Sequence, residues 1–279
     1  MSKLTTRLRE LIQACFTGIW IETQECHDAL QELQSLCRTS SWRLLTWDIS
    51  QGLRSGEAPV EGVGKDPIST LQAIARLGDP QGTTVVVMQG LNRFLGSAEV
   101  IQALANQLQA GKQTRVFLLV LAPTAQLPPE LEKAFLCVQH HLPDRDELRE
   151  MALGLVSPAE FPPGSDLGAI LDAASGLTRN EAENAFSLSL VRENRLAPEA
   201  IWELKAQSLR KSGALTLYRG GANFDQLGGL QGLKAFCRRA LRRRESVGNT
   251  RPKGLLLLSP PGCGKSQFCK ALGAETGRP

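Results

Sequence analysis

The stretch KGLLLLSPPGCGKSQF, from Lys253 to Phe268, joins an apolar run to a loop rich in glycine and proline. A strand, a loop of the pattern G-x-x-x-x-G-K-[ST] and a helix together form a phosphate-binding unit. Gly264–Ser266 fit the end of this pattern, whereas Ser259 stands where its first glycine belongs. We therefore expect a phosphate loop between a strand over 253–258 and a helix that begins near Lys265.

The residue types of this loop suit the binding of phosphate groups. Glycines 262 and 264 have no Cβ, so backbone N–H groups can converge on an anion at the start of a helix, where the helix dipole favours negative charge. Lys265 would meet the β- and γ-phosphates, and the Ser266 hydroxyl would hold Mg²⁺. The residues predicted to bind the nucleotide are Pro261, Gly262, Cys263, Gly264, Lys265, Ser266 and Gln267.

Upstream of this loop, apolar stretches alternate with helical patterns. Continuous apolar strands, as opposed to alternating ones, predict a parallel sheet covered by helices on both faces, and hence an α/β fold. The glycine-rich segment 51–67 predicts an exposed loop. A helix within 97–111 is expected to stop at Gly111. The predicted strands are 18–23, 41–50, 83–90, 114–123 and 134–143.

The pattern changes after Pro143 and becomes helical over four segments, and a new module begins near Phe224. We therefore predict three parts: an α/β domain over 1–143, a helical lid over 144–215, and the start of a second α/β module over 216–279. The order suggests an internal duplication in which the second copy carries the phosphate loop.

Composition limits the function classes. The chain has 279 residues, 42% of them hydrophobic, a net charge of +4 and seven cysteines. No apolar run reaches the roughly 18 residues that a membrane helix needs, and no secretory signal begins the chain. An odd number of cysteines without a C-x-x-C pair favours free thiols and a cytoplasmic location. The pair His140–His141 lacks further ligands at metal spacing, so we expect solvent-facing histidines at a strand end.

The segment PPGCGKS (Pro260–Ser266) resembles the phosphate loop of the AAA ATPases, which usually reads PPGTGK followed by Ser or Thr. FDQLGGLQGLK (Phe224–Lys234) resembles the stretch that opens an AAA module. The resemblance implies a P-loop-NTPase-like parallel sheet with a helical lid, ATP and Mg²⁺ as cofactors, and adenine against the backbone of Leu227 and Gly228.

The first module is similar to an AAA domain in its segments LPPELEKAF, LPDRDELREM and SGLTRNEAENAF. It differs from an active ATPase at the positions of the catalytic and phosphate-binding residues. Its first strand runs into QECHDAL without a glycine loop or lysine, and Gln89 and Gly90 replace the Asp-Glu pair that orients Mg²⁺ and water. The arrangement resembles AAA proteins of cyanobacteria and red-algal plastids, in which a degenerate N-terminal half precedes an intact ATPase half.

The second module carries the phosphate loop but no acidic pair, sensor residue or arginine finger, so we expect no catalytic residue within this chain and no hydrolysis by it alone. We interpret the chain as the N-terminal portion of a longer protein, either because the gene product is truncated or because the sequence is incomplete. The alternative is a naturally short protein. The resemblance implies a parent that hydrolyses ATP to remodel a protein partner and can form an AAA homo-oligomer. The alternative is a nucleotide-independent adaptor. Nucleic-acid binding through Arg238, Arg239 and 242–244 is the weakest hypothesis, and no membrane partner is expected.

Overall fold

A computed structural model describes residues 3–78, 82–156, 167–212, 218, 223–242 and 255–276. The chain divides into two compact units, Met1–Leu142 and Pro143–Pro279. The first unit contains a sheet, and the second is helical in its described residues. No helix among the described residues is long and apolar enough to cross a membrane.

The sheet of the first unit has the strand order β4-β3-β2-β5-β6-β1-β7. Five of its strands are parallel, which confirms the predicted parallel sheet and the α/β class. Strand β1 lies between β6 and β7, so both of its neighbours come later in the chain. The parallel strands are β1 (Gly18–Glu22), β2 (Arg43–Asp48), β5 (Thr84–Gln89), β6 (Val116–Ala122) and β7 (Leu136–Gln139).

The segment expected to be an exposed loop extends the sheet instead, so that prediction was wrong. Strand β3 (Gly52–Ser55) pairs antiparallel with β2, and β4 (Ala58–Pro59) pairs antiparallel with β3. Leu53 is buried in the core. The glycines and charges of this segment lie in the tight turns and on the exposed side, which is why composition alone suggested a loop.

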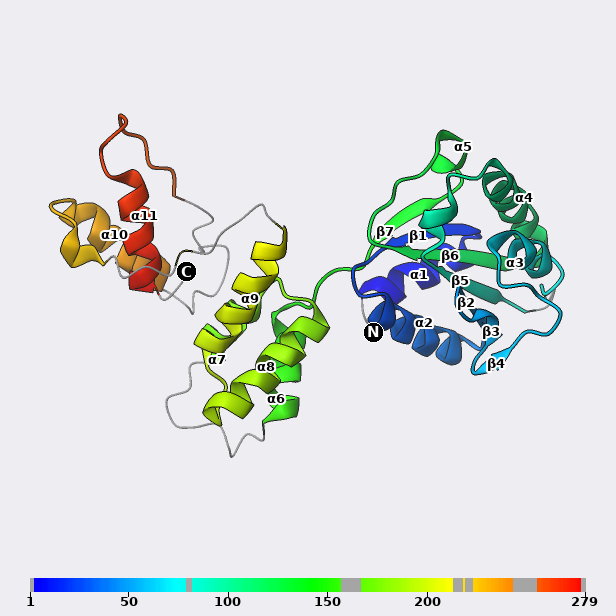
Figure 1. Cartoon of the computed structure of the whole chain (residues 1–279), viewed down its shortest axis with the longest axis horizontal. Coiled ribbons are helices and arrows are strands. Elements are labelled where there is room, and N and C mark those ends of the chain that lie inside the picture. Colours follow the sequence, from blue (N-terminus) through cyan, green and yellow to red (C-terminus); the bar gives the residue numbers. More distant parts are fainter. Residues whose placement is uncertain are drawn as a thin grey trace. The chain divides into compact units, whose positions relative to one another are not determined.

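Helices cover both faces of the sheet, as predicted (Figure 1). Successive residues of a strand point to opposite faces, so Trp20 lies in the cluster with α3 (Pro67–Ile74) and α4 (Ala98–Thr114). Its neighbours Ile19 and Ile21 lie in the cluster with α1 (Lys3–Gln13) and α2 (Cys26–Ser40). The short elements η1 (Leu91–Phe94) and α5 (Pro129–Glu132) complete the first unit.

Helix α4 runs past Gly111, which was expected to end it, and stops at Arg115 in a left-handed conformation with φ 52°. A Cβ at Gly111 would lie 2.4 Å from the carbonyl oxygen of Val116 and 3.1 Å from Thr17 Cγ2. This glycine therefore serves the close approach of α4 to the sheet and does not terminate the helix.

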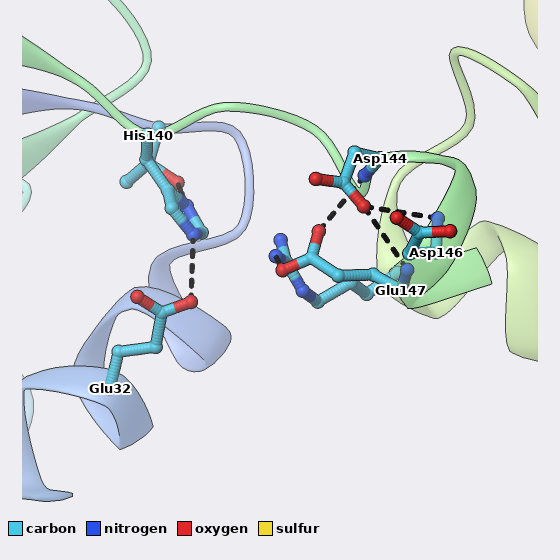
Figure 2. A network of polar contacts seen from close by, with 7 residues as sticks. Glu32, His140, Asp144, Asp146 and Glu147 are labelled. Carbon is cyan, nitrogen blue, oxygen red and sulfur yellow. Dashed lines mark hydrogen bonds and ion pairs between the residues drawn. The ribbon is translucent and has the colours of Figure 1, made fainter. Parts of the chain in front are cut away.

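The second unit begins with the four helices that the sequence predicted for the lid. Asp144 caps α6 by accepting the backbone N–H groups of Asp146 and Glu147, while Glu147 accepts the N–H of Asp144 (Figure 2). A second reciprocal cap, between Thr178 and Glu181, begins α8. The lid helices are α6 (Arg145–Leu155), α7 (Leu167–Ala174), α8 (Arg179–Glu193) and α9 (Pro198–Ser212).

The C-terminal part of the second unit contains η2 (Phe224–Gln226), α10 (Gln231–Arg242) and α11 (Lys265–Thr276). Helix α11 packs against η2 and α10 (Figure 1). The predicted strand over 253–258 is wrong for the residues that the structure describes, because Leu255–Leu258 belong to no strand. Leu256 and Leu258 are 81% and 85% exposed. A strand needs a neighbour for its backbone hydrogen bonds, and no described segment supplies one here.

Candidate nucleotide-binding site

The phosphate-loop residues lie together at the start of α11. Residues 261–264 form a turn, and α11 begins at Lys265, directly after it. Gly262 and Gly264 have φ angles of +83° and +79°, in the left-handed region that favours glycine. A Cβ at either position would meet open space, so the backbone angle, and not crowding, requires glycine there.

This geometry fits a phosphate group. The first turn of a helix leaves backbone N–H groups without helical partners, and the aligned peptide dipoles favour an anion at that end. Ser266 and Gln267 lie exposed on this first turn. The loop residues 261–264 are exposed as well, so a ligand can reach the site. These residues fit ATP with Mg²⁺, in which Ser266 would supply the hydroxyl ligand and Lys265 the positive charge.

Lys265 is folded back onto its own loop. Its ammonium donates to the carbonyl oxygens of Ser259 at 2.7 Å and Pro260 at 2.9 Å, and to Ser259 Oγ at 3.2 Å. A lysine has three N–H donors, and all three have acceptors here. To reach a phosphate, Lys265 must release these oxygens. Ser259, the departure from the glycine pattern, thus touches the residue that carries the positive charge of the site.

The segment predicted to face adenine packs beside the helix that carries the loop. Phe224 stacks on Phe268 of α11, with ring centroids 5.4 Å apart. Leu227 and Leu257 pack against the same apolar cluster, whereas Gly228 is exposed. The structure therefore brings Leu227 and the first turns of α11 into one small core.

Lys234 is a residue of this part that sequence reasoning missed. Its residue is 4% exposed, and its ammonium donates to the carbonyl oxygens of Phe224 at 2.8 Å and Leu227 at 2.5 Å. The signal was present in the sequence, because Lys234 stands beside Leu233 and three residues before Cys237, on the apolar stripe of α10. A lysine on a buried stripe needs acceptors, and here two backbone oxygens supply them.

The first unit has no phosphate loop at the corresponding place. Only Thr23, Gln24 and Glu25 connect β1 to α2. Thr23 Oγ1 accepts the backbone N–H of Glu25 at 2.9 Å, so a side chain of the protein itself occupies a donor at the start of the helix. At the end of β5, the Gly90 N–H donates to the Leu121 carbonyl at 3.2 Å. Neither Gln89 nor Gly90 offers the carboxylate that a Mg²⁺ site needs.

His140 fills the space beside this turn. Its side chain is 3% exposed, its Nδ1 lies 2.8 Å from Thr23 Oγ1, and its Nε2 lies 3.6 Å from Glu32 Oε1 (Figure 2). The expectation of a solvent-facing histidine was wrong for His140, because the end of β7 turns its ring against α2. Among the described residues no group of histidine, cysteine, aspartate and glutamate could hold a metal ion.

The basic helix α10 is partly neutralised by its neighbour. Arg238 Nε donates to Glu275 Oε1 of α11 at 2.8 Å, and its guanidinium lies 5.3 Å from the centroid of the Phe224 ring. The hydrogen bond with Glu275, which raises the pKa of Arg238, ties α10 to the last turn of α11. This residue therefore joins elements of the site and is not a free basic group.

Comparison with known proteins places residues 4–140 and 145–212 of the chain in a family. The model of the SpoVK-like AAA ATPase N-terminal domain matches residues 4–140, and the model of the second domain of the same family matches residues 145–212. These two ranges make up most of the chain. They cover the sheet with its flanking helices and the four helices of the lid.

Individual relatives extend over the C-terminal part as well. The "Uncharacterized AAA domain-containing protein ycf46" of Guillardia theta is 22% identical over 278 residues, which are 96% of this chain and 55% of the relative. The protein of the same name from Pyropia yezoensis is 23% identical over 281 residues, 97% of this chain and 57% of the relative.

A third relative matches a shorter part. The "ATPase family gene 2 protein homolog B" of Rattus norvegicus is 32% identical over 134 residues, 45% of this chain and 16% of the relative. The chain spans little more than half the length of the ycf46 proteins that it matches. Two models of one family, matched in order over the sheet domain and the lid, show that this chain belongs to the SpoVK-like AAA ATPases.

Proposed function

We propose that this chain binds ATP with Mg²⁺ at Pro261–Gln267 and that adenine lies against Leu227 and Gly228. The observation that carries the proposal is the loop itself, in which two left-handed glycines precede a helix whose first residue is Lys265. Membership of an ATPase family supports the same ligand.

A full-length protein built on this chain would hydrolyse ATP and use the energy to remodel a protein partner. Phosphoryl transfer requires an acidic pair and a charge that stabilises the transition state, besides a phosphate loop. The described residues near the loop include no such pair, so hydrolysis requires groups beyond those that the structure describes. We further propose a cytoplasmic location, which seven free cysteines support, and assembly with further copies of the protein.

Thiol protection tests ATP binding directly. Cys263 lies exposed inside the loop, and Cys269 lies exposed on the following turns of α11, so the second thiol is a matched control. Saturating ATP with Mg²⁺ should slow alkylation of Cys263 by about tenfold or more and leave the rate at Cys269 unchanged. Lys265→Ala should abolish the protection. Equal alkylation rates at Cys263 with and without ATP would overturn the proposal.

A second candidate is a nucleotide-independent adaptor. It is favoured by the first unit, where Thr23 caps the turn after β1 and Gln89 and Gly90 stand at the end of β5. An adaptor would retain its protein partner in the Lys265→Ala variant and without ATP. A remodelling ATPase would change its affinity for the partner when ATP is added, and the Lys265→Ala variant would not show that change.

A further inference from the structure

Lys234 is a buried charged residue that the proposed ATP site does not use directly. Burying an ammonium is costly unless hydrogen bonds replace its lost hydration. Among the described residues its ammonium meets no carboxylate, and its hydrogen-bond acceptors are the carbonyl oxygens of Phe224 and Leu227. Lys234 therefore stabilises the local backbone conformation through these hydrogen bonds, and it forms no ion pair with a described carboxylate.

The two bonds fix one short stretch of chain. The Phe224 carbonyl also accepts the Leu227 N–H at 3.3 Å, and the Asn223 side chain accepts the Gln226 N–H at 3.0 Å. Gly229 and Leu230 then turn the chain in left-handed conformations, with φ of 66° and 57°, into α10. Lys234 reaches back across this turn and closes it.

The hydrogen bonds within this turn determine which backbone N–H and C=O groups remain available to a ligand. The N–H and C=O of Leu227 are both used inside the turn. The next residue, Gly228, is exposed, and among the described residues its N–H and C=O have no hydrogen-bond partner. An adenine edge offers one donor, its amino group, and one adjacent acceptor nitrogen. A single residue with free N–H and C=O groups matches that edge, whereas guanine presents the opposite order.

The stretch is also tied to the helix that carries the phosphate loop. Phe224 stacks on Phe268, and Arg238 pairs with Glu275, both partners lying on α11. The position of Gly228 relative to α11 therefore depends on the turn that Lys234 closes.

We propose that Lys234 is a positioning residue that sets the base preference of the site by presenting the Gly228 backbone to adenine. This inference rests on the proposed binding of ATP at the phosphate loop. The loop alone would bind inorganic tripolyphosphate, which has no base, so the contributions of the two parts can be separated.

The test compares the dissociation constants of ATP, GTP and tripolyphosphate, each with Mg²⁺, for the 279-residue chain and its variants. Lys234→Met keeps an unbranched apolar stem as far as Cε and removes the ammonium with its donors. It should weaken ATP about tenfold and bring the ATP and GTP constants together, while tripolyphosphate stays within about twofold. Lys270→Met, at an exposed lysine of α11, is the matched control and should change none of the three.

Lys234→Arg is the second variant, because it keeps the charge and changes the direction of the donors. It should reduce the preference for ATP over GTP without changing tripolyphosphate binding. An equal loss of all three ligands in Lys234→Met would overturn the inference, since Lys234 would then support the whole fold of this part. An unchanged ATP to GTP ratio in both variants would overturn it too. A wild-type chain that binds neither ATP nor tripolyphosphate would instead refute the proposed function.

Discussion

Lys265 is the residue on which the proposed chemistry depends, and Ser259 is the neighbour that sets its position without ligand. The hydroxyl and carbonyl of Ser259 accept two of the three lysine hydrogen bonds. The backbone carbonyl is present whatever the side chain, but the hydroxyl is specific to serine. ATP must compete with this contact for the ammonium.

Ser259→Ala should therefore strengthen ATP binding. Loss of one hydrogen bond to a partly exposed ammonium should lower the dissociation constant about threefold to tenfold. Titration of the chain with ATP and Mg²⁺ measures the effect, and Ser259→Thr, which keeps the hydroxyl, should behave like the wild type. Weaker binding in Ser259→Ala would mean that the hydroxyl helps to hold the nucleotide.

Cys37 gives a second prediction for a single residue. Burial raises the pKa of this thiol from the ordinary value of 9.0 to about 12. Because the unfolded chain loses the proton first, the free energy of unfolding should fall as the pH rises above 9 towards 12, by up to about 1.4 kcal/mol per pH unit. Urea unfolding should show a shallower fall in Cys37→Ala than in Cys15→Ala, whose thiol is exposed. Identical slopes would contradict the assigned burial.

Helices α4 and α6 each contain a glycine, and the two glycines differ in the space around them. A Cβ at Gly111 of α4 would lie 2.4 Å from a backbone oxygen of β6, whereas one at Gly154 of α6 would meet nothing within 4 Å. The two positions offer a matched pair for the same substitution.

Gly111→Ala should lower the free energy of unfolding by about 1–3 kcal/mol, because backbone atoms cannot move aside without disturbing the sheet. Gly154→Ala should raise it by up to about 1 kcal/mol, because alanine favours the helix and open space receives its methyl group. Urea denaturation of both variants checks the pair. A stabilised Gly111→Ala variant would contradict the close contact between α4 and the backbone of β6.

The elements also show what the sequence could predict. Long apolar strands such as β6 and the capped helices α6 and α8 were predictable, because burial on both faces and capping boxes leave local patterns. The strands β3 and β4 were not, since short edge strands with glycine turns have the composition of a loop. The burial of His140 depends on the contact between β7 and α2, which are far apart in the sequence.

For the site, local pattern predicted the loop residues and their place before α11. The apolar run over 253–258 predicted a strand, but a strand must pair with segments elsewhere in the chain, and Leu255–Leu258 form no strand in the described structure. Nor did local pattern predict Lys234, whose role arises from a carbonyl pair seven and ten residues away. Every residue has a backbone carbonyl, so the sequence does not indicate which carbonyl groups a buried lysine will bind.

At the scale of the whole molecule, the two units differ in what they offer a nucleotide. The first unit has a complete sheet, but a short turn capped by Thr23 replaces its phosphate loop, and Gln89 ends β5. The second unit has a phosphate loop at the start of α11. We therefore propose that a nucleotide binds this chain at the second unit and not at the first.

The most direct test is a calorimetric titration of the chain with ATP and Mg²⁺, repeated for Lys265→Ala and Gln89→Ala. We expect one site per chain, lost in Lys265→Ala and unchanged in Gln89→Ala, because the first residue would meet the phosphates and the second lies in the unit without a loop. Binding that survives Lys265→Ala and disappears in Gln89→Ala would contradict this expectation and would assign the site to the first unit.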